Sequence, residues 1–284
     1  RTVLTQLVVT NNVKSGILIC NAADASYVNG DECLIASCLV AGNGAYGIKP
    51  HLDAHKYMRI LNCTVFGNKS RGLGCDYSNN RVVAENSVFW NNGTYDMDSA
   101  TTYGFSMARR CFIGTFNTAI DYNATVGLAA SMNGMGINYN VNQPLEGIFH
   151  FDPDLNADGS LAANSRCVKA GLDLREHPWV GGDEAIDEDL YGTPWNGEYD
   201  LGAIKSTGAN QRGFGASQDV YVAVDGDDAA AGTAAEPVAT LEEGLYRTAA
   251  GGTCHLGEGS WTSHANLFLP GQKLVGAGRD RTVL

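Results

Sequence analysis

The sequence predicts an all-β solenoid, in which short strands alternate with turns and successive coils stack on one another. Three observations favour this class. The chain of 284 residues contains 35 glycines, 7 prolines and only 18% charged residues, a composition typical of strands and tight turns rather than amphipathic helices. A repeat of six aligned columns runs through its first part. The four residues Arg-Thr-Val-Leu occur at positions 1–4 and again at 281–284.

The repeat is anchored by four asparagines, Asn12, Asn43, Asn68 and Asn92, at spacings of 31, 25 and 24 residues. Four positions after each asparagine come Gly16, Gly47, Gly72 and Asp96, each followed by Ile, Leu or Met. Three, five and eight positions before the asparagines lie the columns Val9/Val40/Val65/Phe89, Leu7/Cys38/Cys63/Ser87 and Leu4/Ile35/Ile60/Ala84. Coils of this length, without a helical period, predict a parallel β-helix in which like residues stack at ~4.8 Å.

Each column has an expected role in the stack. We expect the asparagines to occupy a turn, because Asn tolerates the left-handed conformation and its amide can hydrogen-bond to the next Asn. We expect Gly16, Gly47 and Gly72 to occupy a second bend that needs positive φ. The 31-residue spacing predicts an inserted loop within 21–32, and a fifth, irregular coil is expected within 103–121.

Cys38 and Cys63 fall in one column, followed there by Ser87. Stacked side chains point the same way, with Cβ atoms near the strand spacing, whereas a disulfide prefers about 3.8 Å. A ladder of buried, reduced thiols is therefore predicted in place of a disulfide.

Two further stretches carry a resemblance to known proteins. Residues 218–228, with Gly232-Thr233, Glu236-Pro237 and the run 240–245, resemble the opening of right-handed parallel β-helix proteins of the pectate-lyase-like superfamily. Residues 274–284 resemble the next coil of that pattern. Residues 152–171 and 200–204 are similar to the terminal segment of secreted bacterial β-helix surface proteins. The resemblance implies a right-handed helix of strands, a short capping helix, and a place outside the cell or on its surface.

These stretches divide the chain into four parts. Residues 1–125 are predicted to form β-helix coils, 126–205 a closing segment and 206–217 a linker. Residues 218–284 would supply the capping helix and the first coils of a next unit, because the tail at 274–284 reads into the head at 5–12 without a break in pattern.

The sequence therefore predicts a structural surface protein whose units of about 280 residues join head to tail, as a fibre or a tandem-repeat stalk. The units lie either along one chain or in separate subunits, and their partners would be copies of themselves. The residues expected at the joint are Leu4, Leu7 and Val9 at the head, and Leu274, Val275, Val283 and Leu284 at the tail.

Charge and motifs limit other functions. A net charge of −12 argues against nucleic acid as a partner, and no apolar run approaches the ~20 residues of a membrane span. The resemblance would place an Arg base in an R-x-P-x-x-R run, which is absent, and Asp227-Asp228 lacks the companion motifs of polygalacturonase-like enzymes. No catalytic residue is predicted. The alternative is a polysaccharide lyase or hydrolase, or a glycan-binding module, on a β-helix flank, with Trp90 facing outward to stack on a sugar.

One segment matches the first half of a calcium loop. Asp154, Asn156 and Asp158 are spaced as in D-x-N-x-D-G, with Gly159 after them, but Ser165 stands where a bidentate acid is expected. The pattern predicts either an Asx-rich turn or a calcium site. No other cofactor is predicted.

Overall fold

The computed structural model describes residues 2–20, 32–51, 57–74, 81–97, 105–114, 148–149, 152–174, 186–208, 213–261, 269 and 271–284. The inserted loop expected within 21–32 lies outside these residues except for Glu32, as does the stretch 115–147.

The described residues of 2–114, together with Ile148–Phe149, form three sheets, and every pair of neighbouring strands in them is parallel. The first sheet has the order β1-β4-β7-β10-β13, with strands Thr2–Thr5, Glu32–Ala36, Tyr57–Leu61, Arg81–Glu85 and Phe105–Arg109. The second has the order β15-β14-β11-β8-β5-β2, with strands Ile148–Phe149, Cys111–Ile113, Val88–Trp90, Thr64–Phe66, Leu39–Ala41 and Val8–Thr10. The third has the order β12-β9-β6-β3, with strands Tyr95–Met97, Arg71–Leu73, Ile48–His51 and Ile17–Cys20.

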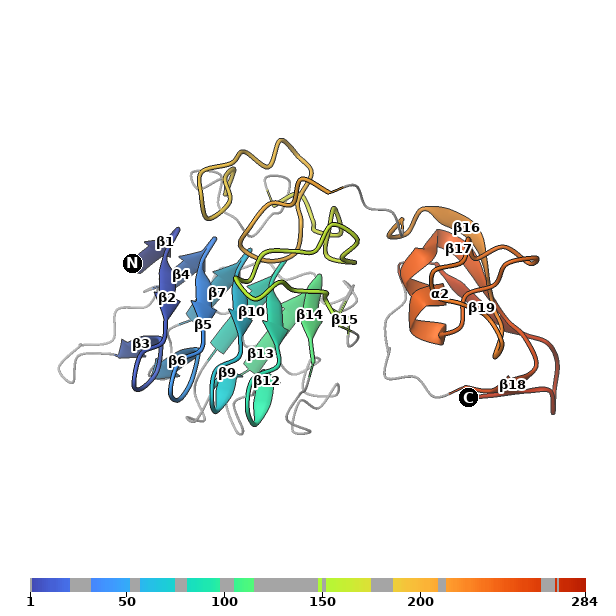
Figure 1. Cartoon of the computed structure of the whole chain (residues 1–284), viewed down its shortest axis with the longest axis horizontal. Coiled ribbons are helices and arrows are strands. Elements are labelled where there is room, and N and C mark those ends of the chain that lie inside the picture. The colour runs from blue at the N-terminus through green and yellow to red at the C-terminus, as the bar shows by residue number, and fades with distance from the viewer. Residues whose placement is uncertain are drawn as a thin grey trace, which may run out of the picture.

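The chain visits the three sheets in turn, so that β1, β2 and β3 form a first coil and β4, β5 and β6 a second. Figure 1 shows the strands of successive coils side by side, from blue at β1 to green at β14. The register follows the repeat, since Leu4 pairs with Ile35 and Val9 pairs with Val40. The predicted columns are therefore neighbours across parallel strands.

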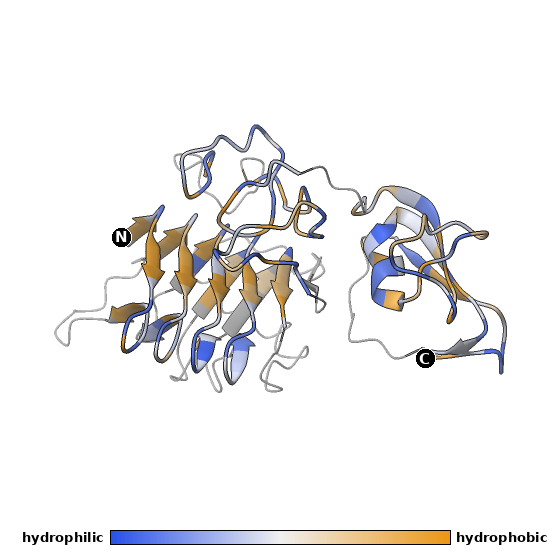
Figure 2. Ribbon diagram, in the orientation of Figure 1, coloured by the Kyte–Doolittle hydropathy of each residue, from blue (hydrophilic) through white to orange (hydrophobic). Residues whose placement is uncertain are grey.

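The core lies between the three sheets. Many of its buried members come from the predicted apolar columns and from the residues after the Gly column, such as Ile35, Val65 and Ile48. Most strands of these sheets are hydrophobic along their length (Figure 2). Such runs are typical of parallel strands that are covered on both faces.

Two bends per coil use left-handed backbone. The bend between the first and second sheets has positive φ at Gln6, Ser37, Asn62, Asn86 and Arg110, and the bend between the second and third sheets at Asn11, Gly42, Gly67 and Asn91. The prediction that the repeat asparagines themselves take this conformation is wrong by one residue. The preceding residue turns the chain, which leaves each repeat asparagine free to direct its side chain along the stack.

The closing segment packs on the outside of the coils. Outward side chains of the first and second sheets, such as Leu34 and Phe112, form clusters with residues from 161–174, 186–190 and 195–203. Figure 1 shows this stretch looping above the coils. The strands are thus buried on their outer faces as well as on the core side.

Residues 213–284 form a smaller unit. It contains a parallel sheet of order β16-β17-β19 and a parallel pair β18-β20, with strands Ser217–Val222, Thr248–Leu256, Lys273–Gly276, Gly259–Ser260 and Thr282–Val283. Helix α2, Leu241–Arg247, packs on β16 and β17. Thr240 caps it, because the Thr240 hydroxyl accepts a hydrogen bond from the Glu243 N–H.

The described part of the chain is therefore all-β, with parallel sheets and one short helix. That helix is too short to cross a lipid bilayer, and no membrane-crossing helix occurs among the described residues.

Candidate functional site

The four repeat asparagines form one hydrogen-bonded column. Asn12 donates from both its backbone N–H and its side-chain Nδ2 to Asn43 Oδ1, at 3.1 and 2.9 Å. Asn43 donates in the same way to Asn68 (3.0 and 2.8 Å), and Asn68 to Asn92 (3.1 and 2.8 Å). Each amide is both donor and acceptor, so the column has a direction. We call it the asparagine ladder.

Asp96 ends the asparagine ladder. Its Oδ1 accepts from the Asn92 backbone N–H (2.8 Å) and from Asn92 Nδ2 (2.6 Å), within the same coil. A carboxylate accepts without donating, so it needs no further member beyond it. At the other end Asn12 is exposed. The ladder is therefore closed at the fourth coil and open at the first.

The glycine column serves close approach and not positive φ, which corrects the prediction. None of Gly16, Gly47 and Gly72 is among the residues with positive φ. A Cβ added to Gly47 would lie 2.6 Å from Val65 Cγ1 and 2.8 Å from Asn68 Nδ2. A Cβ added to Gly16 would lie 2.7 Å from Asn43 Nδ2, and one added to Gly72 would lie 2.7 Å from Asn92 Nδ2. The asparagine ladder fills the space that the missing side chains leave.

Cys38 and Cys63 are buried thiols in the described structure and form no disulfide there. Each Sγ donates across its bend to the carbonyl two residues earlier, Cys38 to Ala36 (3.1 Å) and Cys63 to Leu61 (3.3 Å). Ser87 Oγ makes the equivalent bond to Glu85 at 2.9 Å. Thiol and hydroxyl are interchangeable in this column because both donate to a buried bend carbonyl.

A further polar column, six residues before the asparagine ladder, has no counterpart among the predicted sites. It consists of the left-handed residues of the first bend. Four of their side chains bond to the closing segment, and that of Arg110 contacts the smaller unit. The contacts are Gln6 Nε2 to Asp189 O (2.9 Å), Ser37 Oγ to Glu188 O (2.9 Å), Asn62 Nδ2 to Asp200 O (3.0 Å), Asn86 Nδ2 to Leu172 O (2.8 Å), and Arg110 over the Phe214 ring (4.4 Å). Polar residues at positions 6, 37, 62 and 86 were the signal that could have found it.

Helix α2 is joined to the closing segment by a buried charge cluster. The fully buried Glu243 carboxylate contacts Arg166 Nε at 2.6 Å and Arg247 at 2.7 Å. Arg247 also donates to the carbonyls of Ala230 and Asp228. Both carboxylate oxygens are therefore satisfied, which is the condition under which a buried charge is tolerated.

The residues expected at the joint lie in two separate places. Leu4, Leu7 and Val9 belong to the first coil, where β1 and β2 each stand at the end of a sheet. Leu274, Val275, Val283 and Leu284 belong to the smaller unit, on or beside β19 and β20. The structure does not bring the two groups together within the chain. Leu7, Val275, Val283 and Leu284 are exposed, and Leu4, Val9 and Leu274 are half-buried.

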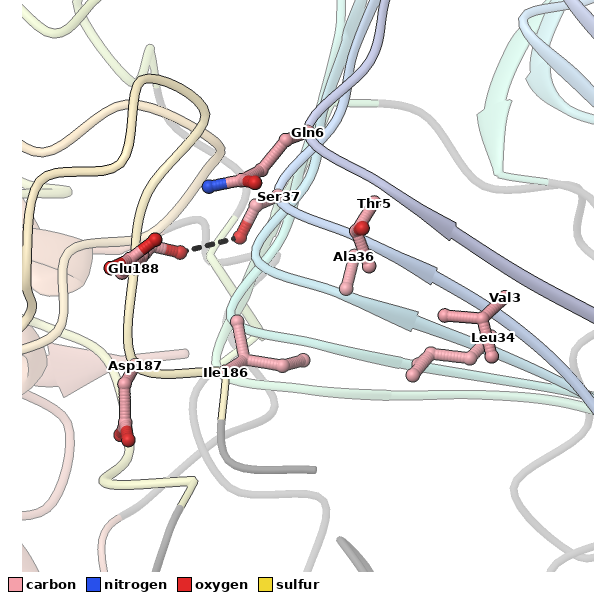
Figure 3. A pocket seen from close by; sticks show the side chains of 9 residues that line it. All are labelled: Val3, Thr5, Gln6, Leu34, Ala36, Ser37, Ile186, Asp187 and Glu188. Carbon is pink, nitrogen blue, oxygen red and sulfur yellow. Dashed lines mark hydrogen bonds between the residues drawn. The ribbon is translucent and has the colours of Figure 1, made fainter. Parts of the chain in front are cut away.

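A groove of about 430 Å³ opens beside the first coil. One wall is made by β1 and β4 and the other by the closing segment, and Figure 3 shows Ser37 Oγ bonded across to the Glu188 carbonyl. The lining is apolar toward the sheet and acidic at the closing segment; its residues are Val3, Thr5, Gln6, Leu34, Ala36, Ser37, Ile186, Asp187 and Glu188.

The predicted calcium loop makes turn hydrogen bonds. Asp158 Oδ1 accepts from the Ser160 N–H (3.0 Å) and hydroxyl (2.6 Å), which lowers the pKa of Asp158. Asn156 Nδ2 donates to Ser160 Oγ at 3.0 Å, and the Asp154 N–H donates to Asp152 at 2.8 Å. Within the described ranges no group of three or more His, Cys, Asp or Glu side chains could hold a metal ion. Calcium binding here stays a prediction.

The other candidates have structural partners. Asp228 accepts from the backbone N–H of Ala239 and Thr240 and from the Thr240 hydroxyl, at 2.8–2.9 Å, so it shapes the start of α2. Asp227 accepts from the Ala229 N–H. Trp90 faces outward, as expected, but it is half-buried there because it packs against a cluster that includes residues of the closing segment.

Comparison with protein-family models, with curated proteins and with solved structures found no match to this chain.

Proposed function

We propose that the chain is a structural protein of the cell exterior or surface, a right-handed parallel β-helix whose units join head to tail into a fibre or a stalk. The observation that carries this proposal is the uncovered first coil. Its strands β1, β2 and β3 stand at the ends of their sheets in the described structure, and the asparagine ladder is open there.

The right-handed β-helix is supported by the path of the chain. Three parallel sheets are visited in a fixed cyclic order, and equivalent residues pair from coil to coil. Connections between parallel strands of one sheet are right-handed in about 98% of cases. The resemblance of residues 218–245 to the opening of such proteins supports the same assignment.

End-to-end joining is supported by what the two ends leave exposed. Edge strands offer unpaired N–H and C=O groups, and natural sheets cover or charge such edges. The first coil instead exposes Leu7 and Val8, and the tail exposes Val283 and Leu284. Two different surfaces that complement one another form a heterologous contact, which propagates when it does not close into a ring.

A surface location and glycan partners are further parts of the proposal. The low charge, the stacked coils and the resemblance of 152–171 to secreted surface proteins favour the exterior. The groove beside the first coil, with Asp187 and Glu188 in its lining, favours a glycan-binding role as the second candidate. Calorimetric titration with oligosaccharides, comparing the chain with an Asp187→Asn, Glu188→Gln variant, tests that candidate.

One variant at each end tests the head-to-tail contact. Leu7→Glu should disrupt the head and Val275→Glu, on the edge strand β19, the tail, because each would bury a charge in the joint. Sedimentation velocity and electron microscopy at micromolar concentration should show association of the parent chain and monomers of each variant. An equimolar mixture of the variants should stop at dimers, since one good tail remains to meet one good head.

Tyr191→Glu provides the matched control. Tyr191 is 69% exposed in the closing segment and is not among the residues expected at the joint, so this variant should associate as the parent does. A parent chain that stays monomeric throughout, or variants that associate as the parent does, would contradict the proposal.

A further inference from the structure

The same tripeptide, Thr-Val-Leu, lies on two different sheet edges. In the tail, β20 pairs in parallel with β18, with Thr282 opposite Gly259 and Val283 opposite Ser260. In the head, β1 pairs in parallel with β4, with Thr2 opposite Cys33 and Val3 opposite Leu34. One sequence thus has two partners, and in each place only one of its edges is paired within the described structure.

The two partners use opposite sides of the strand. In the tail, the carbonyls of Arg281 and Val283 accept from the N–H groups of Gly259 and Trp261, both at 2.8 Å. Arg281 and Val283 correspond to residues 1 and 3 of the head, so the odd-numbered residues of the repeated strand bond to β18.

In the head, the even positions face β4. The Gln6 N–H donates to the Ala36 carbonyl at 3.1 Å, and the Leu4 carbonyl accepts from Cys38 Sγ at 3.7 Å. Alternate peptide groups of a strand point to opposite edges. A single strand could therefore bond to β18 with its odd positions and to β4 with its even positions at the same time.

Burial is complementary in the same way. Leu284 is 72% exposed in the described structure. The equivalent Leu4 is half-buried against the core that the second coil supplies. On the tail side, the buried Trp261 follows β18. In the described structure, the tail copy has β18 beside it but no equivalent of β4, and the head copy has β4 beside it but no equivalent of β18.

We propose that the joint between two copies of this chain contains one shared Arg-Thr-Val-Leu strand, lying between β18 of one copy and β4 of the next. This rests on the proposed head-to-tail contact and defines its register, in which Ser260, the Val of the shared strand and Leu34 are in line. Two such strands compete for one position, so one of them is displaced when the copies join.

Deletion of one tetrapeptide tests the competition. Chains lacking residues 1–4 or residues 281–284 should associate at about tenfold lower concentration than the full chain, equivalent to ~1.4 kcal/mol, because no strand has to leave its edge. A chain lacking both should associate more weakly than the full chain, because no strand bridges β18 and β4. Sedimentation velocity measures the four chains, and thermal unfolding followed by circular dichroism checks that each is folded.

Cross-linking tests the register in the chain lacking residues 281–284, where only the head copy can form the shared strand. Ser260→Cys combined with Val3→Cys should give intermolecular products with a short bis-maleimide, whereas Ser260→Cys with Tyr191→Cys should give only the background of the parent chain. Equal yields from the two pairs would overturn the shared strand.

The outcomes separate the two proposals. If no chain in the deletion series associates, the head-to-tail contact itself fails, and the shared strand fails with it. If the chain lacking both tetrapeptides associates as well as the single deletions, the contact stands and the shared strand is wrong.

Discussion

At the scale of the residue, the asparagine ladder depends on a side chain that donates and accepts at once. Asn68 accepts from Asn43, donates to Asn92 at 2.8 Å, and also donates to the Val40 carbonyl at 3.2 Å. It is buried, so no water can replace a lost partner. Each buried position of the asparagine ladder therefore needs a side-chain amide, which donates and accepts at the same time.

We expect Asn68→Asp to lower the free energy of unfolding by about 3 kcal/mol or more, since it places a charge against two acceptors in the interior. Asn12→Asp is the matched control, because Asn12 is exposed at the open end, and it should cost well below half as much. Urea unfolding of both variants measures the difference. Equal losses would remove the ladder from the account of stability.

Buried thiols make stability depend on alkaline pH. Burial raises the pKa of Cys254 from 9.0 to about 12, and raises the pKa of Cys63 and Cys167. A raised pKa in the folded state means that the neutral thiol is favoured there, so this contribution is complete below the unfolded value and is lost as pH rises from about 9 toward 12.

The free energy of unfolding should therefore fall above pH 9, by up to ~1.4 kcal/mol per pH unit for each such thiol. Denaturant titrations between pH 7.5 and 10.5 on the parent and on Cys254→Ala measure the slopes. The free energy of unfolding of Cys254→Ala should fall less steeply with pH than that of the parent, because one fewer thiol loses its proton on unfolding. Parallel slopes would mean that the Cys254 thiol does not contribute.

At the scale of the element, two kinds of glycine position the coils. Gly47 gives room for the neighbouring coil, whereas Gly67 has φ of 63° and a Cβ there would meet no described atom within 4 Å. The equivalents of Gly67 in the first and fourth coils are Asn11 and Asn91, also with positive φ. The bend thus accepts any residue that tolerates left-handed backbone.

Gly67→Asn should consequently change the free energy of unfolding by less than about 1 kcal/mol, while Gly47→Asn should cost roughly 3 kcal/mol or prevent folding, because the coils cannot move apart. Thermal unfolding compares the two variants. A larger loss for Gly67→Asn would show that positive φ, and not close approach, limits these positions.

The contact between α2 and the closing segment depends on Glu243. Glu243→Gln would leave Arg166 and Arg247 partly buried without their counter-charge, and we expect a loss of roughly 3 kcal/mol. Glu258→Gln is the control, since its pair with Arg281 is exposed on both sides and should contribute at most about 0.5 kcal/mol. Urea unfolding of both variants tests this, and similar losses would contradict it.

At the scale of the whole molecule, the fold has a closed side and an open one. The closing segment covers outer faces of the first and second sheets, and Asp96 ends the asparagine ladder at the fourth coil. In the described structure no strand pairs with the outer edges of β1, β2 and β3 in the first coil. A solenoid with one uncovered end is stabilised by whatever binds that end.

Association should therefore raise the thermal midpoint with protein concentration, because joining stabilises only the folded chain. Scanning calorimetry from about 1 to 100 μM should show a rising midpoint for the parent chain and a constant one for Leu7→Glu. A constant midpoint for the parent would show that the ends do not join in this range.

Much of the coil architecture could be predicted from the sequence, because stacking like residues imposes a period that spacing reveals. The columns containing Val9, Leu4 and Asn12 could be aligned on that ground. The reason for a glycine at position 47 could not be predicted, because a need for close packing and a need for positive φ both place a glycine in the sequence. The bend column with Ser37 and Asn62 was missed because its partners lie more than a hundred residues away.

The sequence by itself determined the all-β class, the length of the coils and which residues stack, since these follow from local periodicity. Only the tertiary structure decided which residue turns each bend, where the asparagine ladder ends and which faces the closing segment covers. It also showed that the repeated Thr-Val-Leu pairs through opposite edges at the two ends. Those features depend on contacts between distant segments, and a local pattern carries no record of them.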